Sequence, residues 1–336
     1  MRKLLSTLLA GSLLAALVTL DYGCKKDDGT TNPIQTVPTY PVAMTVQSPS
    51  GQPQGGALVS LKNPPYADPT FQAYTDTAGK ATIMAPEGPQ TIVAKMGTIF
   101  QTEVNVTVVK STSPLVVPPV RLVQNTALKV LVVKASAEQL EDVLRVIGFT
   151  TFDSTTIYAL RDSANLDSAR TLNSLRQYSL IFSDCDGGSE GSSNYAALSR
   201  VYGRYVQGGG KMYGGHYNYY HLQRVWTTYF DAYDYQGNSS TDTLRIIDQN
   251  LSSYVGYSIA RWNSIDSRNL SGYEKFSDLP ATSKVYAVIK NTSPQVGVIV
   301  ENYVGTGKYL WTDYHNQDIK DDPNLVKLVK YFLYSL

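Results

Sequence analysis

The segment from residue 178 to residue 215 constrains the fold of this chain more than any other. It begins with a short apolar run, YSLIFS at residues 178–183, which is typical of a strand buried on both faces. A helical pattern follows at residues 193–207, and three glycines lead into a second short strand at residues 211–214. A strand, a crossover helix and a second strand form the unit of an open parallel α/β sheet, whose ligands bind beyond the carboxyl ends of the strands. The sequence therefore predicts where a site lies, but not what it binds.

The length and charge of the chain limit its architecture and its partners. Its 336 residues give room for two domains, each with its own hydrophobic core. The 29 basic and 28 acidic residues leave a net charge of +1, so nothing indicates a nucleic-acid partner. The 25 tyrosines and the low share of charged residues, 17%, are typical of the polar, uncharged surfaces of secreted and cell-surface proteins.

The first 28 residues predict export and membrane anchoring. Arg2 and Lys3 precede an apolar run at residues 4–20, which is the pattern of a secretory signal. The Gly23-Cys24 junction resembles the lipobox of bacterial lipoproteins, although Asp21 stands where that family prefers Leu. The resemblance implies that residues 1–23 are a signal peptide and that Cys24 is lipidated.

The residues that follow Cys24 indicate the destination of the chain. The sequence KKDD at residues 25–28 resembles the signal that sends some lipoproteins to the exterior face of the outer membrane. The predicted partner at this end of the chain is thus the outer membrane, held through the lipid anchor. Residues 24–38 are polar and contain Gly and Pro, so we expect a flexible tether.

Residues 39–110 are expected to form a small β-sandwich. Short alternating strands separated by Gly and Pro turns fill this region. The segment TDTAGKA at residues 75–81 predicts a tight hairpin in which Gly79 takes a positive φ angle. With GALVSL at residues 56–61 and EGPQ at residues 87–90, the region resembles the carboxypeptidase-regulatory-like, or transthyretin-like, family. That resemblance implies a non-catalytic spacer or adhesion module.

Residues 111–126 predict a last strand and then a stiff linker, because Pro114, Pro118 and Pro119 interrupt short apolar runs. Residues 127–336 then form the second domain. It opens with a buried strand at residues 128–133 and a helix at residues 137–147 that Ser136 is expected to cap. Further expected elements are a helix at 167–176, strands at 284–290, 296–301 and 308–312, and a final helix at 324–336, whereas residues 230–285 are expected to be irregular.

The second domain resembles the class I glutamine amidotransferase-like fold, which is a flavodoxin-like, three-layer α/β fold. The resemblance rests on YSLIF at residues 178–182 followed by DGG at 186–188, on YVQGGGKMYGG at 205–215, and on GTGK and WTDYHN at 305–308 and 311–316. Active members present a cysteine in the turn after the second of these strands, and a histidine late in the chain activates it.

The resemblance also implies that the amidotransferase chemistry is lost. The turn contains His216, Tyr217 and Asn218, with neither Cys nor Ser. His315 stands where the late histidine is expected, but Asn316 follows and no acidic residue lies two positions on. We therefore expect a non-catalytic domain, and a thiol beside an imidazole at this edge would contradict that expectation.

Cys185, the only cysteine besides Cys24, admits two interpretations. It is either a displaced nucleophile or a small residue of a strand-end turn. We favour the second, because the flanking carboxylates of Asp184 and Asp186 would raise the pKa of its thiol.

The predicted function is the binding of a ligand or partner, with a glycan as one candidate and no cofactor. The candidate ligand-binding residues are His216, Tyr217, Asn218, Asp184, Asp186, His315 and Asn316. A cluster of tyrosines at residues 213–235 could stack on sugar rings. The alternative is a metal-assisted hydrolase of polysaccharide or peptide, in which His216, His315 and Asp184 would hold a divalent ion.

Overall fold

The structure is a computed structural model that describes residues 37–187, 189, 192–225, 240–265, 282–289, 297–312 and 316–336. The expected signal peptide and Cys24 lie outside these residues, as does most of the tether. Residues Pro38–Leu336 form one compact unit. In the part of the chain that the structure describes, no helix combines the length and the apolar character needed to cross a membrane.

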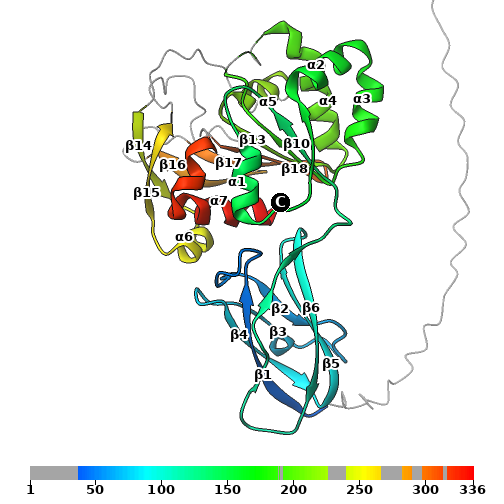
Figure 1. Cartoon of the computed structure of the whole chain (residues 1–336), viewed down its shortest axis with the longest axis vertical. Coiled ribbons are helices and arrows are strands. Elements are labelled where there is room, and N and C mark those ends of the chain that lie inside the picture. Colours follow the sequence, from blue (N-terminus) through cyan, green and yellow to red (C-terminus); the bar gives the residue numbers. More distant parts are fainter. Residues whose placement is uncertain are drawn as a thin grey trace, which may run out of the picture. The chain divides into compact units, whose positions relative to one another are not determined.

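Two β-sheets occupy the N-terminal part of this unit (Figure 1). In one sheet, β1 (Thr39–Gln47) pairs with β4 (Lys80–Pro86), β7 (Leu115–Val116) and β8 (Val120–Arg121). The other has the order β3 (Gln72–Tyr74), β2 (Leu58–Leu61), β5 (Gly88–Met96), β6 (Phe100–Val108) and β9 (Val123–Gln124). Alternate residues of both sheets, such as Val42 and Met44 of β1 and Ile92 and Ala94 of β5, are buried in one hydrophobic cluster. The assignment of this region to the carboxypeptidase-regulatory-like family stays a prediction.

The expected linker at residues 111–126 is drawn into both sheets. Its apolar residues form β7, β8 and β9, of which the first two pair in parallel with β1 and the third pairs with β6. Each strand is two residues long, since prolines interrupt the run and cannot donate to a strand ladder. The segment is therefore part of the N-terminal sheets, and it is less independent of them than the sequence indicates.

The hairpin at Gly79 has the conformation that the sequence predicts. Gly79 has φ +74°, and the Asp76 carboxylate accepts hydrogen bonds from the backbone N–H groups of Ala78 and Lys80, both at 2.9 Å. A Cβ atom at Gly79 would lie 2.4 Å from the carbonyl oxygen of Val46. Both the backbone angle and the close approach of β1 therefore require glycine.

The C-terminal part is built on a nine-stranded sheet. Its order is β11 (Asp153–Thr156), β10 (Val130–Lys134), β12 (Leu180–Ser183), β13 (Lys211–Gly215), β18 (Gly307–Thr312), β17 (Gly297–Val304), β16 (Ser283–Ile289), β14 (Ser240–Ile246) and β15 (Ile259–Ile265). The first five strands pair in parallel, and in chain order they read 2-1-3-4-5, which is the flavodoxin-like order. The other four extend the sheet with antiparallel pairs. The predicted α/β fold class is thus supported by the topology itself.

Helices cover both faces of the parallel sheet (Figure 1). They are α1 (Leu140–Ile147), α2 (Ile157–Leu166), α3 (Ser168–Leu175), α4 (Ala196–Gln207), α5 (Tyr219–Val225), α6 (Gln249–Val255) and α7 (Pro323–Ser335). Val130 and Val132 of β10 belong to the same hydrophobic cluster as the buried residues of α1 and α7. The alternating residues Leu131 and Val133 belong to the cluster of α2, α3 and α4. Successive strand residues point to opposite faces, so the continuous apolar runs in the sequence reflect burial on both sides.

The expectation of irregular structure at residues 230–285 is wrong for the described part of this range. Residues 240–246 and 259–265 form the antiparallel pair β14 and β15, with α6 between them. Polar residues such as Asp242 and Asn263 interrupt the apolar pattern, which is why the strand periodicity is weak in the sequence. Within this range an exposed loop is expected at residues 238–241, but residues 240 and 241 belong to β14, and residues 238 and 239 lie outside the described residues.

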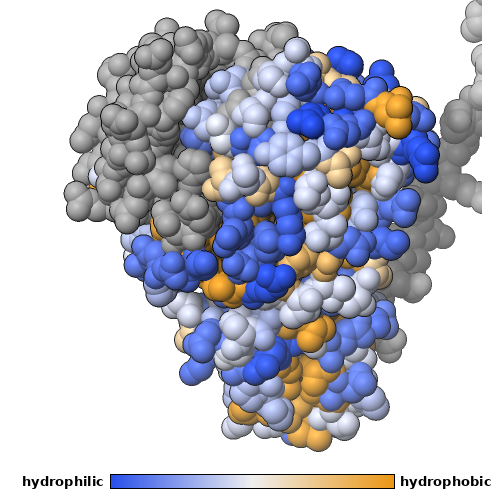
Figure 2. Space-filling model, turned by 45° about the horizontal axis from the view of Figure 1, so that its top comes forward, coloured by the Kyte–Doolittle hydropathy of each residue, from blue (hydrophilic) through white to orange (hydrophobic). Residues whose placement is uncertain are grey.

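Large hydrophobic side chains reach the surface singly. The three most exposed are Leu166 of α2, at 90%, Val116 of β7, at 75%, and Tyr74 of β3, at 72%. On the face shown in Figure 2, hydrophobic residues likewise form separate patches among hydrophilic ones. Scattered exposure of this kind is ordinary for a folded protein and marks no interface by itself.

Replacing Gly79 by alanine should destabilise the N-terminal sheets by about 3 kcal/mol, because a left-handed backbone angle and a clash with Val46 act together. The matched control is Gly88→Ala. Gly88 also has a positive φ, +100°, but a Cβ there meets nothing within 4 Å, so the cost should be only about 1 kcal/mol. Urea unfolding monitored by circular dichroism measures both. Equal costs would show that β1 moves aside without penalty.

Candidate functional site

The carboxyl ends of β12 and β13 bring the predicted site residues together. The two strands pair in parallel, with Ser183 opposite Gly214. The segment Asp184-Cys185-Asp186 therefore leaves the sheet beside the turn that begins at His216. Five of the seven predicted ligand-binding residues, Asp184, Asp186, His216, Tyr217 and Asn218, lie in these two segments.

The turn after β13 is a strained elbow. His216 has φ +41° and is the only non-glycine residue with a positive φ in the described part of the chain. Its carbonyl oxygen accepts a hydrogen bond from the indole Nε1–H of Trp311 on β18, at 2.7 Å. Gly214 precedes the turn, and a Cβ there would lie 2.4 Å from the hydroxyl oxygen of Tyr309. A backbone outlier held by its surroundings in this way is common at functional sites.

Cys185 lies against this elbow. Its Sγ is 3.6 Å from Nδ1 of His216, and it also accepts a hydrogen bond from the backbone N–H of Gly187, at 3.3 Å. The backbone N–H of Cys185 donates to the Glu138 carboxylate at 3.1 Å. Both side chains of the pair are buried, with 0% of Cys185 and 2% of His216 exposed. The sequence-based interpretation of Cys185 as a small residue of a strand-end turn thus missed its imidazole neighbour.

Asp184 joins the sheet to α1. Its carboxylate accepts hydrogen bonds from the backbone N–H groups of Leu140, at 3.2 Å, and Ala135, at 3.4 Å. Burial, together with the nearby carboxylates of Glu138 and Glu141, raises its pKa from 3.8 to about 8. A neutral carboxyl group at physiological pH therefore satisfies the first turn of the helix.

The expectation that Ser136 caps this helix is wrong. α1 begins three residues later than predicted, and the Ser136 hydroxyl donates instead to Asp186, at 3.0 Å. A serine directly after a strand lies at the sheet edge, where an acidic residue of the next strand end competes for its hydroxyl. The backbone N–H of Leu140, the first residue of α1, donates instead to the Asp184 carboxyl group.

Asp186 is held by a shell of hydroxyl groups. Besides Ser136, the hydroxyls of Tyr158, Ser189 and Tyr195 donate to its carboxylate, at 2.5, 2.5 and 2.6 Å. Burial alone would raise the pKa of Asp186, but these hydrogen bonds outweigh it and lower the pKa below 3.8. Asp186 is therefore an anion whose lone pairs are engaged inside the protein, which limits its use as a ligand-binding group.

The two residues after His216 differ in their surroundings. The Asn218 side-chain amide is buried and donates to the carbonyl oxygens of Ser183, Asp184 and Gly215, at 3.0 to 3.2 Å. It ties the ends of β12 and β13 together. Tyr217 instead packs on the His216 ring, with centroids 3.9 Å apart, and neighbours Tyr219 and Tyr220.

The remaining predicted residues give no metal centre in the described part of the chain. His315 lies outside it, and Asn316 opens the 3-10 helix Asn316–Asp321. Among the described residues, no group of three or more His, Cys, Asp and Glu side chains could hold a metal ion. His221 is fully buried against Ser199, and burial together with the nearby Arg224 lowers its pKa to about 3. The metal-assisted hydrolase stays an untested prediction.

Sequence reasoning missed Glu138, Tyr158 and Tyr195, which complete the surroundings of the two aspartates. Glu138 could have been found, because the loop after the first parallel strand ends at the same sheet edge as residues 184–186. Tyr158 lies in the first turn of α2 and Tyr195 directly precedes α4, and no spacing in the sequence connects them to Asp186.

Similarity to known proteins is found in the fold and not in the sequence. No family model and no curated protein matches the chain. Among solved structures, a Thermoplasma acidophilum protein assigned to GMP synthase is 12% identical, with a TM-score of 0.42 over 62% of this chain and 94% of that one. The Trypanosoma brucei CTPS glutaminase domain is 14% identical, with the same TM-score of 0.42 and the same coverage of 62% and 94%. A glutamine amidotransferase from Thermotoga maritima is 12% identical, with a TM-score of 0.35 over 63% and 94%. The flavodoxin-like fold of the α/β part rests on its own strand order, and the resemblance to class I glutamine amidotransferases stays a prediction.

Asp184 should make the stability of the protein depend on pH. Its folded-state pKa, about 8, lies above the ordinary 3.8, so its contribution to stability is complete below pH 4 and is lost as the pH rises through 8. The variant Asp184→Asn, which keeps the neutral form, should therefore gain about 4 kcal/mol relative to wild type as the pH rises from 5 to 9. Asp142→Asn, at an exposed ion pair with Arg145, is the control and should leave the pH profile unchanged. Urea unfolding across this pH range measures the three profiles. If the free energy of unfolding changes with pH in the same way for wild type and Asp184→Asn, the raised pKa of Asp184 is contradicted.

Proposed function

We propose that this protein is a lipid-anchored binding protein of the outer membrane, facing the cell exterior. Its amidotransferase-like domain holds a ligand at the carboxyl edge of the sheet and does not act on it. The observation that carries this proposal is the elbow after β13, where the residue at the position of the expected nucleophile is His216. The two acidic side chains beside it are engaged internally, Asp184 with α1 and Asp186 with four hydroxyl groups.

Aromatic rings beside the elbow support a glycan as the ligand. Tyr217 and Tyr220 lie nearly parallel, at an interplanar angle of 11° with centroids 6.1 Å apart, and Tyr219 and Tyr220 have centroids 4.2 Å apart. Tyr219 and Tyr220 are half-buried, so part of each ring faces outward. Flat rings with hydroxyl groups offer an apolar face to a sugar and a hydrogen bond at its edge.

The pairing of Cys185 with His216 supports a second candidate, a thiol-dependent activity. An imidazole 3.6 Å away could take the thiol proton, and the Gly187 N–H would stabilise the resulting thiolate. The short distance between the Cys185 thiol and the His216 imidazole is the arrangement that would contradict a non-catalytic domain. Its burial favours the binding function, since a nucleophile must reach its substrate, and 0% of Cys185 is exposed.

A glycan array probed with the purified protein tests the binding function. The variants Tyr219→Ala and Tyr220→Ala should each weaken binding to the best glycan about tenfold, which corresponds to about 1.4 kcal/mol of lost stacking. The control is Tyr74→Ala, a 72% exposed tyrosine of β3 away from this edge, which should leave affinity unchanged. Glycan binding that survives both variants would place the ligand elsewhere.

Alkylation of Cys185 by iodoacetamide, followed by mass spectrometry of its peptide, decides between the two candidates. The binding function predicts that Cys185 of the folded protein stays unmodified at pH 6 and reacts only after denaturation, because its thiol is buried. The dyad predicts the opposite, which is rapid labelling at pH 6, well below the ordinary thiol pKa of about 8.5, and loss of that labelling in His216→Gln. Rapid labelling that depends on His216 would overturn the non-catalytic assignment.

A further inference from the structure

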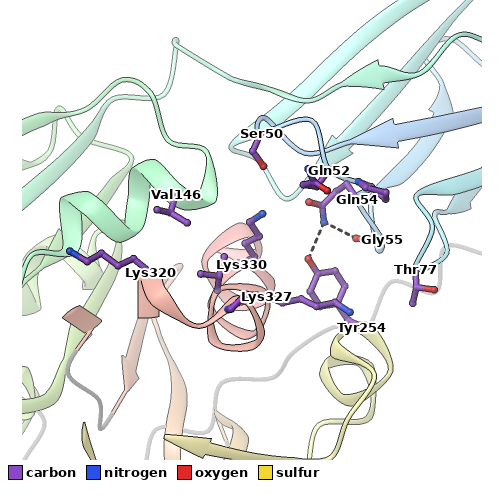
Figure 3. Close-up of a pocket in the computed structure, with 13 residues that line it drawn as sticks. Ser50, Gln52, Gln54, Gly55, Thr77, Val146, Tyr254, Lys320, Lys327 and Lys330 are labelled. Atoms are coloured by element: carbon purple, nitrogen blue, oxygen red, sulfur yellow. Dashed lines mark hydrogen bonds between the residues drawn. The ribbon is translucent and has the colours of Figure 1, made fainter. Parts of the chain in front are cut away.

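A cationic pocket lies away from the sheet edge described above. Figure 3 shows it between the loop that follows β1 and helices α6 and α7. Its volume is about 460 Å³, within the range of small-molecule sites. The polar groups in its lining come from Ser50, Gln52, Gln54, Thr77, Tyr254, Lys320, Lys327 and Lys330.

The loop and the helices that form this pocket are packed against each other. Gln54 donates a side-chain hydrogen bond to the Tyr254 hydroxyl at 3.0 Å, which Figure 3 marks with a dashed line. Nearby, the Phe100 ring of β6 contacts Phe149 and Tyr334, with centroids 5.1 and 4.6 Å apart. The pocket is therefore enclosed by elements that share a hydrophobic core.

The charge in the pocket has one sign. Three lysines line it, and no lining residue is acidic. Lys327 donates to the carbonyl oxygen of Val255 at 2.9 Å, and Lys320 reaches the Asp142 carboxylate only at 3.9 Å. Lys330 is partly buried and forms no hydrogen bond or ion pair with any residue that the structure describes. Lys330 is thus the one of the three lysines without a partner among the described residues, and an unpaired ammonium group in a partly enclosed space attracts an anion.

The protonation behaviour of Lys330 is consistent with a missing partner. Burial lowers the pKa of its ammonium group, because desolvation disfavours the charged form. A negative charge beside it would favour the charged form and so oppose this shift.

The neutral groups favour a sugar as the carrier of that charge. The side chain of Gln52 makes no hydrogen bond within the described residues, and Ser50 bonds only to Ser48, at 2.9 Å. Amide and hydroxyl groups are suited to sugar hydroxyls, and the Tyr254 ring supplies a flat face. A pocket of this volume has room for one or two sugar rings.

We propose that this pocket binds an acidic saccharide, with its carboxylate or sulfate group on Lys330. The proposal is independent of the ligand at the sheet edge, because the two sites share no lining residue. It assigns a site to the contact between the N-terminal sheets and the α/β domain, where no sequence motif indicates one.

Isothermal titration calorimetry with defined disaccharides tests this site. The probes are digalacturonate and a sulfated heparin disaccharide, with neutral digalactose as the matched uncharged sugar. Lys330→Met should weaken binding of the acidic probes at least tenfold, whereas Lys330→Arg should stay within about threefold of wild type. The control Lys95→Met removes an exposed charge of β5 that does not line the pocket, and should leave affinity unchanged.

The outcomes separate this site from the sheet edge and from simple charge attraction. Tyr219→Ala should leave binding of the acidic disaccharides intact even where it abolishes glycan-array binding. Equal affinity for digalactose, binding of neither acidic probe, or equal weakening by Lys95→Met would overturn the proposal. So would binding of inorganic phosphate that matches that of the disaccharides, since it would indicate a site for small anions alone. Circular dichroism of each variant establishes that it is folded.

Discussion

The parallel pairing of β10, β12, β13 and β18 is the constraint on which the rest of the α/β domain depends. Each of these strands is buried on both faces, so a shift of one residue would exchange the side chains that pack against α1 and α7 with those that pack against α2, α3 and α4. The register is therefore fixed by two cores at once. It makes Asp184 and His216 neighbours, because the strands that precede them end together.

The same ladder explains how a strained residue persists at the elbow. The Trp311 indole reaches across from β18 to the carbonyl group of His216, and the Asn218 amide holds the ends of the two strands from the other side. These are contacts between elements that the sheet already places side by side. The unfavourable φ of His216, which costs of the order of 1–3 kcal/mol, is thus maintained by packing that exists independently of the site.

How well a feature of this structure can be predicted from the sequence depends on how far apart along the chain the interacting residues lie. The strands β10, β12 and β13, the helices α3 and α4 and the glycine hairpin at Gly79 follow from periodicity and turn chemistry over a few residues, and the structure has them close to the expected bounds, whereas β11 and α2 are not predicted. The cap of α1 is wrongly predicted as Ser136, because the real acceptor, Asp184, is 44 residues away from Leu140. The contact between Cys185 and His216 depends on both the strand register and a positive φ at a histidine, and neither can be inferred from the spacing of these residues. The pocket lined by lysines could not be predicted for a similar reason, since Lys327 and Lys330 have the spacing of solvent-facing residues of the final helix, whereas in the structure they line a pocket with the loop after β1.

The short strands β7 and β8 have a mechanical consequence for a protein anchored as proposed. The tether enters β1 at its N-terminal end, whereas the chain leaves β8 at its C-terminal end and passes through β9 to the α/β domain. Because β7 and β8 run parallel to β1, tension between the membrane and a captured ligand would pull these strands along their length in opposite directions. The hydrogen bonds between β1 and these two strands would then be loaded in shear, all at once and not one after another. The pairing of the proline-containing segment with β1 would therefore raise the resistance of the N-terminal sheets to forced unfolding.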